Sequence, residues 1–189
     1  IRDAGLSRGL GDVYKRQAEI SSKGNRPRGL WTMVVTNQQQ EKIVYLYTDG
    51  ACLGNPGPGG WGVVLSWDGQ MKELSGGQVD TTNNQMELTA VIKGLEALKR
   101  PVSLHIVTDS KYVMQGITQW MAGWKSNGWR TAAKKPVANR ELWEKLDSLL
   151  NVHAVTWDWV KGHSGHPQNE MCDRLASEQA ALFKNKLEL

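Results

Sequence analysis

The sequence predicts an α/β domain in which a mixed β-sheet is covered by helices. Two apolar runs, 43–50 and 102–110, are rich in β-branched residues and contain a Thr-Asp pair near their ends, which is typical of buried strands. Two further strand-like runs flank Asp68-Gly69, a sequence that favours a tight hairpin. Segments with helical spacing of apolar residues separate the later strands, and this order indicates a sheet with helices packed on it.

The length and composition indicate one domain of ordinary globular type. With 189 residues, the chain is long enough for a substantial core. No apolar run approaches the roughly 18 residues of a membrane span, and no signal-peptide pattern opens the chain. Cys52 and Cys172 lack metal-type spacing and favour a reducing cytoplasm over a disulfide framework. We therefore expect a cytoplasmic protein.

The net charge of +4 comes from the N-terminal segment. Residues 1–32 hold seven of the 23 Lys and Arg and three of the 19 Asp and Glu, which leaves sixteen of each sign in the remainder. Between Lys111 and Arg140 there are six basic residues and no acidic one. Such a local excess is typical of a surface that faces phosphates, and a solvated helix face is the alternative.

Residues 1–40 are rich in Gly, Arg, Ser and Gln and show no sustained period, which predicts a disordered extension. Met33 is a candidate true start, so the residues before it are either a non-native remnant or a basic nucleic-acid-binding arm. The domain itself is expected at 41–185, followed by a tail at 186–189. Its first strand ends at Asp49, and the Gly- and Pro-rich stretch 50–60 predicts a turn. The runs 61–67 and 71–79 complete an antiparallel meander.

The first helix is predicted to begin near Thr82, because Thr82 and Gln85 fit a capping box. Glu87 lies at the edge of its apolar stripe, where a carboxylate is costly unless an interior salt bridge or another cation neutralises it. We expect this stripe to be buried: Leu88, Val91, Ile92, Leu95 and Leu98.

The second half of the chain predicts three helices, a basic lobe and a last strand. The helices are expected at 110–119, 139–150 and 166–183, and the strand at 152–160. The segment 120–130 spaces three Trp among basic residues and indicates a protruding lobe, with buried core as the alternative. In the strand, apolar residues alternate with polar ones: Val152, Ala154, Trp157 and Trp159. The residues expected to be buried on the last two helices are Leu142, Leu146, Leu149 and Leu150, then Cys172, Leu175, Ala176, Leu182 and Phe183.

Acidic residues mark the candidate site. If strands 43–50 and 102–109 are parallel neighbours, Asp49 and Asp109 emerge side by side. Adjacent carboxylates repel, so one holds a proton or both face a cation, and we favour the cation. The loop 161–167 carries His163 and His166, and a histidine beside an acidic site could move protons. Asn169 and Asp173 lie one turn apart on the last helix.

These motifs together resemble bacterial type I ribonuclease H, in order, from about Ile43 to Phe183. The matching segments are 48–57, 82–88, 108–113, the Trp-rich basic lobe, 159–167 and 169–173. The resemblance implies a ribonuclease H-like fold. In that fold a five-stranded mixed sheet, with three antiparallel strands plus two parallel ones, is flanked by helices and carries a basic, Trp-rich handle.

The implied function is endonucleolytic hydrolysis of the RNA strand of RNA–DNA hybrids by a monomer, leaving 5′-phosphate and 3′-hydroxyl ends. Asp49, Glu87, Asp109 and Asp173 match the family's metal-binding carboxylates, and His163 matches its loop histidine. Two Mg²⁺ ions are implied, with Mn²⁺ as an alternative, and carboxylates suit such hard ions. Two ions about 3.5–4 Å apart can support an in-line displacement.

Further residues match the family's substrate contacts. Short polar groups suit the 2′-hydroxyls of RNA, and aromatic and cationic groups suit the sugars and phosphates of DNA. The resemblance places Cys52, Asn55, Asn83 and Asn84 on the RNA strand, places Thr82, Trp120, Trp124, Lys125 and Trp129 on the DNA strand, and adds Asn169 to the substrate contacts. Asp80 and Lys111 depart from the family pattern. A non-catalytic nucleic-acid-binding module and a nuclease for other DNA remain the alternative functions.

Overall fold

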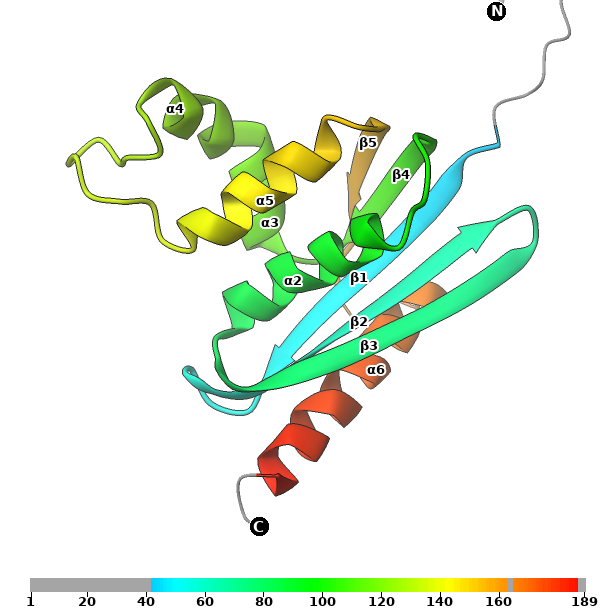
Figure 1. The fold of residues 1–189 in the computed structure, drawn as a ribbon. Helices are drawn as coiled ribbons and strands as arrows, with labels where there is room; N and C mark the ends of the chain where they lie inside the picture. Colours follow the sequence, from blue (N-terminus) through cyan, green and yellow to red (C-terminus); the bar gives the residue numbers. More distant parts are fainter. Residues whose placement is uncertain (1–41, 163–164, 187–189) are drawn as a thin grey trace, which may run out of the picture. The chain divides into compact units, whose positions relative to one another are not determined.

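The computed structural model describes residues 42–162 and 165–186. They form a five-stranded sheet in the order β3-β2-β1-β4-β5 (Figure 1). Strands β1 (Val44–Cys52), β2 (Gly57–Trp67) and β3 (Gln70–Thr81) are antiparallel neighbours, and β4 (Ser103–Thr108) and β5 (Ala154–Trp159) continue the sheet in parallel with β1. This is the mixed sheet that the sequence predicted.

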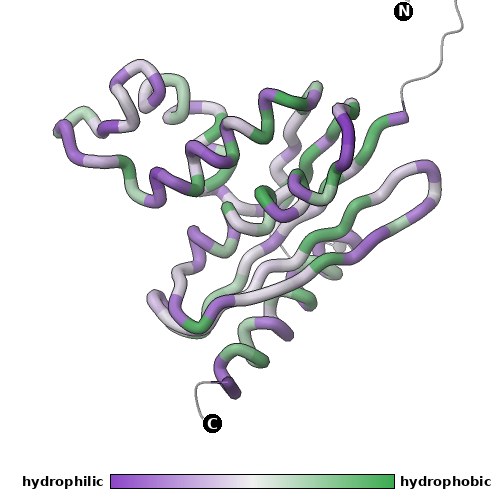
Figure 2. The backbone as a smooth tube through the Cα atoms, viewed as in Figure 1, coloured by the Kyte–Doolittle hydropathy of each residue, from purple (hydrophilic) through white to green (hydrophobic). Residues whose placement is uncertain are grey.

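The β2–β3 turn follows from its two residues. Asp68 and Gly69 both have positive φ angles, 51° and 75°, which is the backbone of a type I′ hairpin turn. In Figure 2 this turn is hydrophilic. The predicted 50–60 turn is wrong in extent, because β1 continues to Cys52 and β2 begins at Gly57. Glycines and a proline are tolerated there since the ladder still pairs Ala51 with Gly60 and Cys52 with Gly59.

Helix α2 (Asn83–Glu96) packs on one face of the sheet. The predicted capping box is confirmed, because Thr82 accepts from the Gln85 backbone and the Gln85 side chain accepts from the Thr82 backbone. Gly94 brings α2 onto β1, since a Cβ there would lie 2.3 Å from a methyl carbon of Leu46. Of the expected stripe, all but the half-buried Leu98 are fully buried.

The handle and its supporting helix follow β4. Helix α3 (Lys111–Gln115), the π-helical turn η1 (Gly116–Trp120) and helix α4 (Met121–Ser126) run on without a break, so the helix predicted at 110–119 extends further than expected. Helix α5 (Arg140–Leu150) then returns to pack on α2. Its most buried residues are Trp143 and Leu146, and the other three predicted leucines are only partly buried.

Helix α6 (Pro167–Asn185) packs on β1, β2 and β3, and Figure 1 shows it on the face opposite α2. The inward prediction for this helix is wrong at Leu182, which is 53% exposed, and Ala180 is buried in its place. Of the alternating apolar residues predicted at 152–160, Val152 precedes the strand and is exposed, Ala154 and Trp159 are exposed within it, and only Trp157 is half-buried, because β5 is an edge strand. Within the described residues, no helix is long and apolar enough to cross a membrane.

Candidate active site

Two acidic residues lie side by side where the pairing of β1 with β4 ends. Thr48 of β1 and Thr108 of β4 are register partners in the parallel pair, and Asp49 and Asp109 directly follow them. The carboxyl ends of adjacent parallel strands lie at the same edge of a sheet. The predicted juxtaposition of Asp49 and Asp109 is therefore confirmed at the level of the backbone.

Glu87 reaches this edge because Gly50 has no side chain. A Cβ on Gly50 would lie 2.3 Å from the backbone nitrogen of Glu87 and 2.5 Å from the carbonyl carbon of Met86. These distances are shorter than any van der Waals contact, so only glycine lets the first turns of α2 approach β1 here. The glycine that follows Asp49 thus sets the position of Glu87.

Asp173 is brought in by glycines on the opposite face of the sheet. Gly62 is the β2 register partner of Asp49, and a Cβ on Gly62 would lie 2.2 Å from the carbonyl oxygen of Cys172. Gly60 meets the next turn of α6, at 2.2 Å from the Ala176 carbonyl oxygen. Helix α6 therefore lies directly on β2, with Asp173 next to the residue that contacts Gly62.

The four acids interact electrostatically. Burial and, after it, the neighbouring carboxylates of Asp109, Asp173 and Glu87 together raise the pKa of Asp49 to about 8, against one opposing hydrogen bond from the Gly50 N–H, 2.7 Å from Oδ1. Burial also raises the pKa of Glu87, although the hydrogen bonds from Ser110 and Asn83 oppose the rise. The charged neighbours that shift Asp49 are all acidic, so a bound cation would relieve their repulsion.

The donor chemistry of this cluster fits a hard divalent ion. All four groups are carboxylates, the ligands that Mg²⁺ and Mn²⁺ prefer. In the described part of the chain, however, no three His, Cys, Asp or Glu side chains are arranged as a ready ion site. Three of the carboxylates accept hydrogen bonds instead: Asp49 from the Gly50 N–H, Asp109 Oδ2 from Asn169 Nδ2 at 3.4 Å, and Glu87 from Asn83 and Ser110. The acids converge without forming a preassembled cage.

Asn169 lies deeper than its place on a helix flank suggested. Asn169 is only 3% exposed, and its Oδ1 finds no hydrogen-bond partner among the described residues. The Oγ1 of Thr48, beside Asp49, is buried and unpaired in the same way. Buried polar atoms normally have partners. Because the Asn169 side chain contacts Asp109 through Nδ2, its unpaired Oδ1 is a candidate ligand contact beside the acids.

The predicted RNA-strand residues gather around the start of α2. Asn55 accepts from the Asn83 backbone N–H at 3.2 Å, and Asn83 Nδ2 donates to Glu87 Oε1 at 2.8 Å. The Cys52 thiol faces the carbonyl oxygens of Gly57 and Thr81 at 3.5 and 3.4 Å. Asn84 is exposed on the first turn of α2. The structure therefore brings these residues into one group that adjoins the acids.

The tryptophans of segment 120–130, which forms the handle, fit both interpretations of this segment, the protruding lobe and the buried core. Trp120 and Trp124 are in contact with their rings tilted by 42° and their centroids 5.6 Å apart, and Trp124 meets the fully buried Trp143 edge-on at 5.5 Å. Trp120, Trp124 and Trp129 are half-buried, so each keeps some surface for a ligand. Lys125 pairs with Asp147 of α5, with Nζ and Oδ1 2.8 Å apart. His163, the predicted loop histidine, lies outside the described residues.

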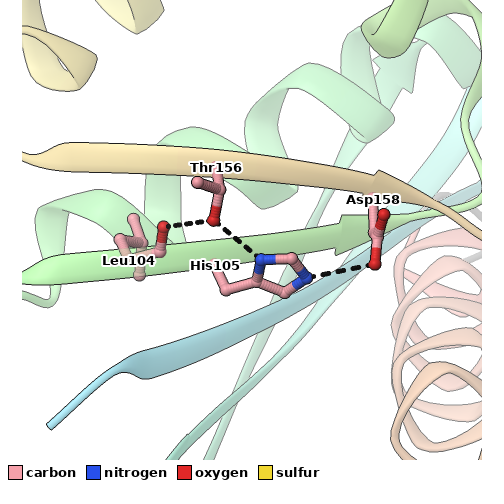
Figure 3. Close-up of polar contacts among 4 residues, drawn as sticks. All are labelled: Leu104, His105, Thr156 and Asp158. Carbon is pink, nitrogen blue, oxygen red and sulfur yellow. Dashed lines mark hydrogen bonds and ion pairs between the residues drawn. The ribbon is translucent and has the colours of Figure 1, made fainter. Parts of the chain in front are cut away.

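A separate polar cluster joins β4 to β5 (Figure 3). His105 Nδ1 lies 2.7 Å from Thr156 Oγ1, and His105 Nε2 lies 3.2 Å from Asp158 Oδ2. Since the Thr156 hydroxyl donates to the Leu104 carbonyl oxygen, its oxygen is available to accept from Nδ1–H. His105 and Thr156 are register partners. This cluster is a cross-strand contact that secures the edge strand.

Several residues important to the site were not singled out from the sequence. Ser110 contacts Glu87, Gly62 admits α6, and Trp143 supports the handle. The Thr-Asp-Ser motif was a signal for Ser110. Gly62 lies in the predicted strand 61–67, just after the stretch 50–60 that was interpreted as a turn, and its packing role was not foreseen. Nothing in the spacing marked Trp143, because the leucines around it have the same helical period.

The chain matches known proteins over the part that builds this site. The family model for RNase H matches residues 40–181. A ribonuclease H of Bradyrhizobium diazoefficiens is 62% identical over 136 residues, covering 72% of this chain and 88% of the relative. A ribonuclease H of Hydrogenovibrio crunogenus is 62% identical over 135 residues, covering 71% and 93%. A ribonuclease HI of Brucella melitensis is 58% identical over 143 residues, covering 76% and 93%.

Solved structures agree with the observed architecture. The crystal structure of LC9-RNase H1, a type 1 RNase H with the type 2 active-site motif, superposes with a TM-score of 0.67 at 34% identity, covering 75% of this chain and 73% of that one. LC11-RNase H1, solved in complex with an RNA/DNA hybrid, has a TM-score of 0.55 at 22% identity and covers 74% and 97%. The second likeness concerns the fold alone.

Proposed function

The chain belongs to the ribonuclease H family, in its bacterial type I branch, and from this premise we propose that Asp49, Glu87, Asp109 and Asp173 bind two Mg²⁺ ions for hydrolysis of the RNA strand of RNA–DNA hybrids. The observation that carries the proposal is the convergence of these acids from β1, α2, β4 and α6 on one edge of the sheet. Because the charged neighbours that shift Asp49 are themselves acidic, the cluster is suited to cations.

Asp49, Glu87, Asp109 and Asp173 would hold the ions, which would supply an activated water and charge stabilisation for the leaving oxygen. The protein's part is to hold the carboxylates in place. Gly50 and Gly62 let α2 and α6 approach the strands, and Asn83 and Ser110 orient Glu87. An in-line displacement of this kind leaves 5′-phosphate and 3′-hydroxyl ends. His163 is the candidate for proton transfer, on the sequence motif alone.

We further propose that the two strands of the hybrid are recognised by different parts of the chain. Cys52, Asn55, Asn83 and Asn84 adjoin the acids and would contact RNA 2′-hydroxyls, which distinguish RNA from DNA. The DNA strand would lie against Thr82 and the handle residues Trp120, Trp124, Lys125 and Trp129, with Asn169 as a further contact beside Asp109. The catalytic domain would span 41–185 and act as a cytoplasmic monomer.

The decisive experiment is cleavage of an end-labelled RNA–DNA hybrid with Mg²⁺, with Mn²⁺ and with excess chelator. We expect RNA fragments only when a divalent ion is present, and no cleavage of double-stranded DNA. Ligation of the products would test for 5′-phosphate and 3′-hydroxyl ends. Binding without cleavage would instead indicate a non-catalytic module, and cutting of duplex DNA would indicate a different nuclease class.

A further inference from the structure

Ser110 provides a hydrogen bond to Glu87 from inside the protein. It directly follows Asp109 and is 4% exposed. Its Oγ donates to Glu87 Oε2, accepts from the Val113 N–H at 3.0 Å and thereby caps α3. The Ser110 N–H donates to Thr108 Oγ1 at 3.2 Å. The residue is therefore held at both its backbone and its side chain.

These contacts determine where the hydroxyl proton goes. A serine hydroxyl has one proton to donate and two lone pairs to accept with. Because the Val113 N–H occupies a lone pair, the proton is free to be directed at Glu87. The other Glu87 oxygen, Oε1, receives Asn83 Nδ2 at 2.8 Å. Each carboxylate oxygen thus accepts one hydrogen bond and keeps lone-pair capacity for an ion.

We propose that Ser110 is a positioning residue that holds the Glu87 carboxylate in the orientation needed to bind a divalent cation. It acts through Glu87 and touches neither substrate nor ion. The inference rests on the proposed role of Glu87 as a metal ligand. Partners that orient a metal-binding side chain typically change metal affinity or activity by about 10–100-fold when they are removed.

The competing explanation is that Ser110 only caps α3. Loss of an N-cap destabilises a protein but does not change how tightly the folded fraction binds an ion. Thr89 offers a matched control, because it is a buried hydroxyl of α2 that donates to the Gln85 carbonyl oxygen at 2.7 Å. Thr89→Ala removes a buried hydrogen bond of α2, the helix that carries Glu87, without altering the contacts of the Glu87 carboxylate.

The test compares Ser110→Ala, Ser110→Thr and Thr89→Ala with the wild type. Mg²⁺ titrations without substrate are followed by NMR at the backbone amides of Gly50 and Glu87, and kcat and KM are measured on a labelled hybrid. We expect Ser110→Ala to raise the Mg²⁺ midpoint and lower kcat by about tenfold or more, with KM for the hybrid within about twofold. Ser110→Thr, which keeps the hydroxyl, should have the Mg²⁺ midpoint and kcat of the wild type. Thr89→Ala should also leave the Mg²⁺ midpoint and kcat unchanged.

A wild-type Mg²⁺ midpoint and kcat in folded Ser110→Ala would overturn the inference and leave the proposed function intact. A wild type that neither binds Mg²⁺ nor cleaves the hybrid would overturn the proposed function itself. Circular dichroism establishes that each variant is folded. If Ser110→Ala does not fold, Ser110→Cys replaces it, since a thiol is similar in size and a much weaker donor, and the same changes are expected.

Discussion

Asp49 faces Gly62 across the antiparallel β1–β2 ladder. The space above Gly62 holds the carbonyl oxygen of Cys172, 2.2 Å from where a Cβ would be. A helix from the far end of the sequence can therefore rest on the strand next to the first acid. This contact brings Asp173, the residue after Cys172, close enough to affect the pKa of Asp49.

Replacing Asp109 by Asn should abolish cleavage while leaving hybrid binding within about twofold. One anionic ligand is lost, and metal ions contribute several kcal/mol to transition-state stabilisation, so we expect at least about a thousandfold lower kcat. Cleavage rates and fluorescence anisotropy with a labelled hybrid measure the two effects. Asp158→Asn, on the neighbouring strand and outside the site, is the control. Full activity in Asp109→Asn would refute the metal assignment.

Gly50→Ala should both destabilise the protein and impair Mg²⁺ binding. The new methyl group would collide with the backbone of Glu87 and Met86, so α2 must shift, at a cost of about 3 kcal/mol or more in the free energy of unfolding. Gly123→Ala in α4 is the control, because a Cβ there meets nothing within 4 Å. That substitution should stabilise the helix by about 0.5–1 kcal/mol. Urea unfolding measures the free energy of unfolding of both variants. An equal change in the two would contradict the close packing at Gly50.

The metal-free protein should lose stability as the pH rises from about 4 to 8. The folded-state pKa of Asp49, about 8, exceeds its ordinary value of 3.8, so in this window the folded state binds more protons than the unfolded state. Stability then falls with rising pH. Urea midpoints in chelator at pH 5 and pH 8 measure the loss, and Asp49→Asn should reduce it. Mg²⁺ should also reduce the loss, and an unchanged pH dependence in Asp49→Asn would contradict the assignment.

Asp147→Asn should increase affinity for the hybrid by about two- to fivefold at low salt. The ion pair with Asp147 occupies the Lys125 ammonium, and an exposed pair of this kind contributes little stability. Its removal frees Lys125 for phosphate and deletes a negative charge. Anisotropy in chelator, at two salt concentrations, measures the gain, which salt should screen. In a Lys125→Gln background the gain should shrink, and a gain of equal size there would show that Lys125 is not involved.

The sheet and the position of its acidic residues could be predicted because the ends of strands leave local signals in the sequence. An apolar run that stops at an acid predicts a strand end there, and two such runs placed Asp49 and Asp109 together, although β1 continues beyond Asp49 to Cys52. Glu87 could also be predicted as a site residue, because the helical wheel places its charged side chain at the edge of the apolar stripe. These are local signals, and they need no knowledge of the tertiary contacts.

The features that escaped prediction depend on contacts between distant segments. The stretch 50–60 reads as a turn, yet it is mostly strand, because α6 requires glycine at Gly60 and the ladder tolerates it. A hydroxyl such as that of Ser110 carries no periodic signal, and only the packing of α2 against β1 and the start of α3 gives it Glu87 as a partner. Trp143 was hidden among leucines that share its helical period.

One consequence of the buried Trp143 concerns how the handle could diverge. Its ring fills the space left by Gly116, where a Cβ would lie 2.0 Å from the indole. The outer part of the handle closes on itself, through the bonds from Val137 N–H to the Trp129 carbonyl and from Thr131 N–H to the Lys135 carbonyl. The segment between η1 and α5 is thus anchored by Trp143 and by the buried Met121 and Val137, while its outer residues do not enter the core. Changes in that outer loop should therefore leave the carboxylates at the sheet in place.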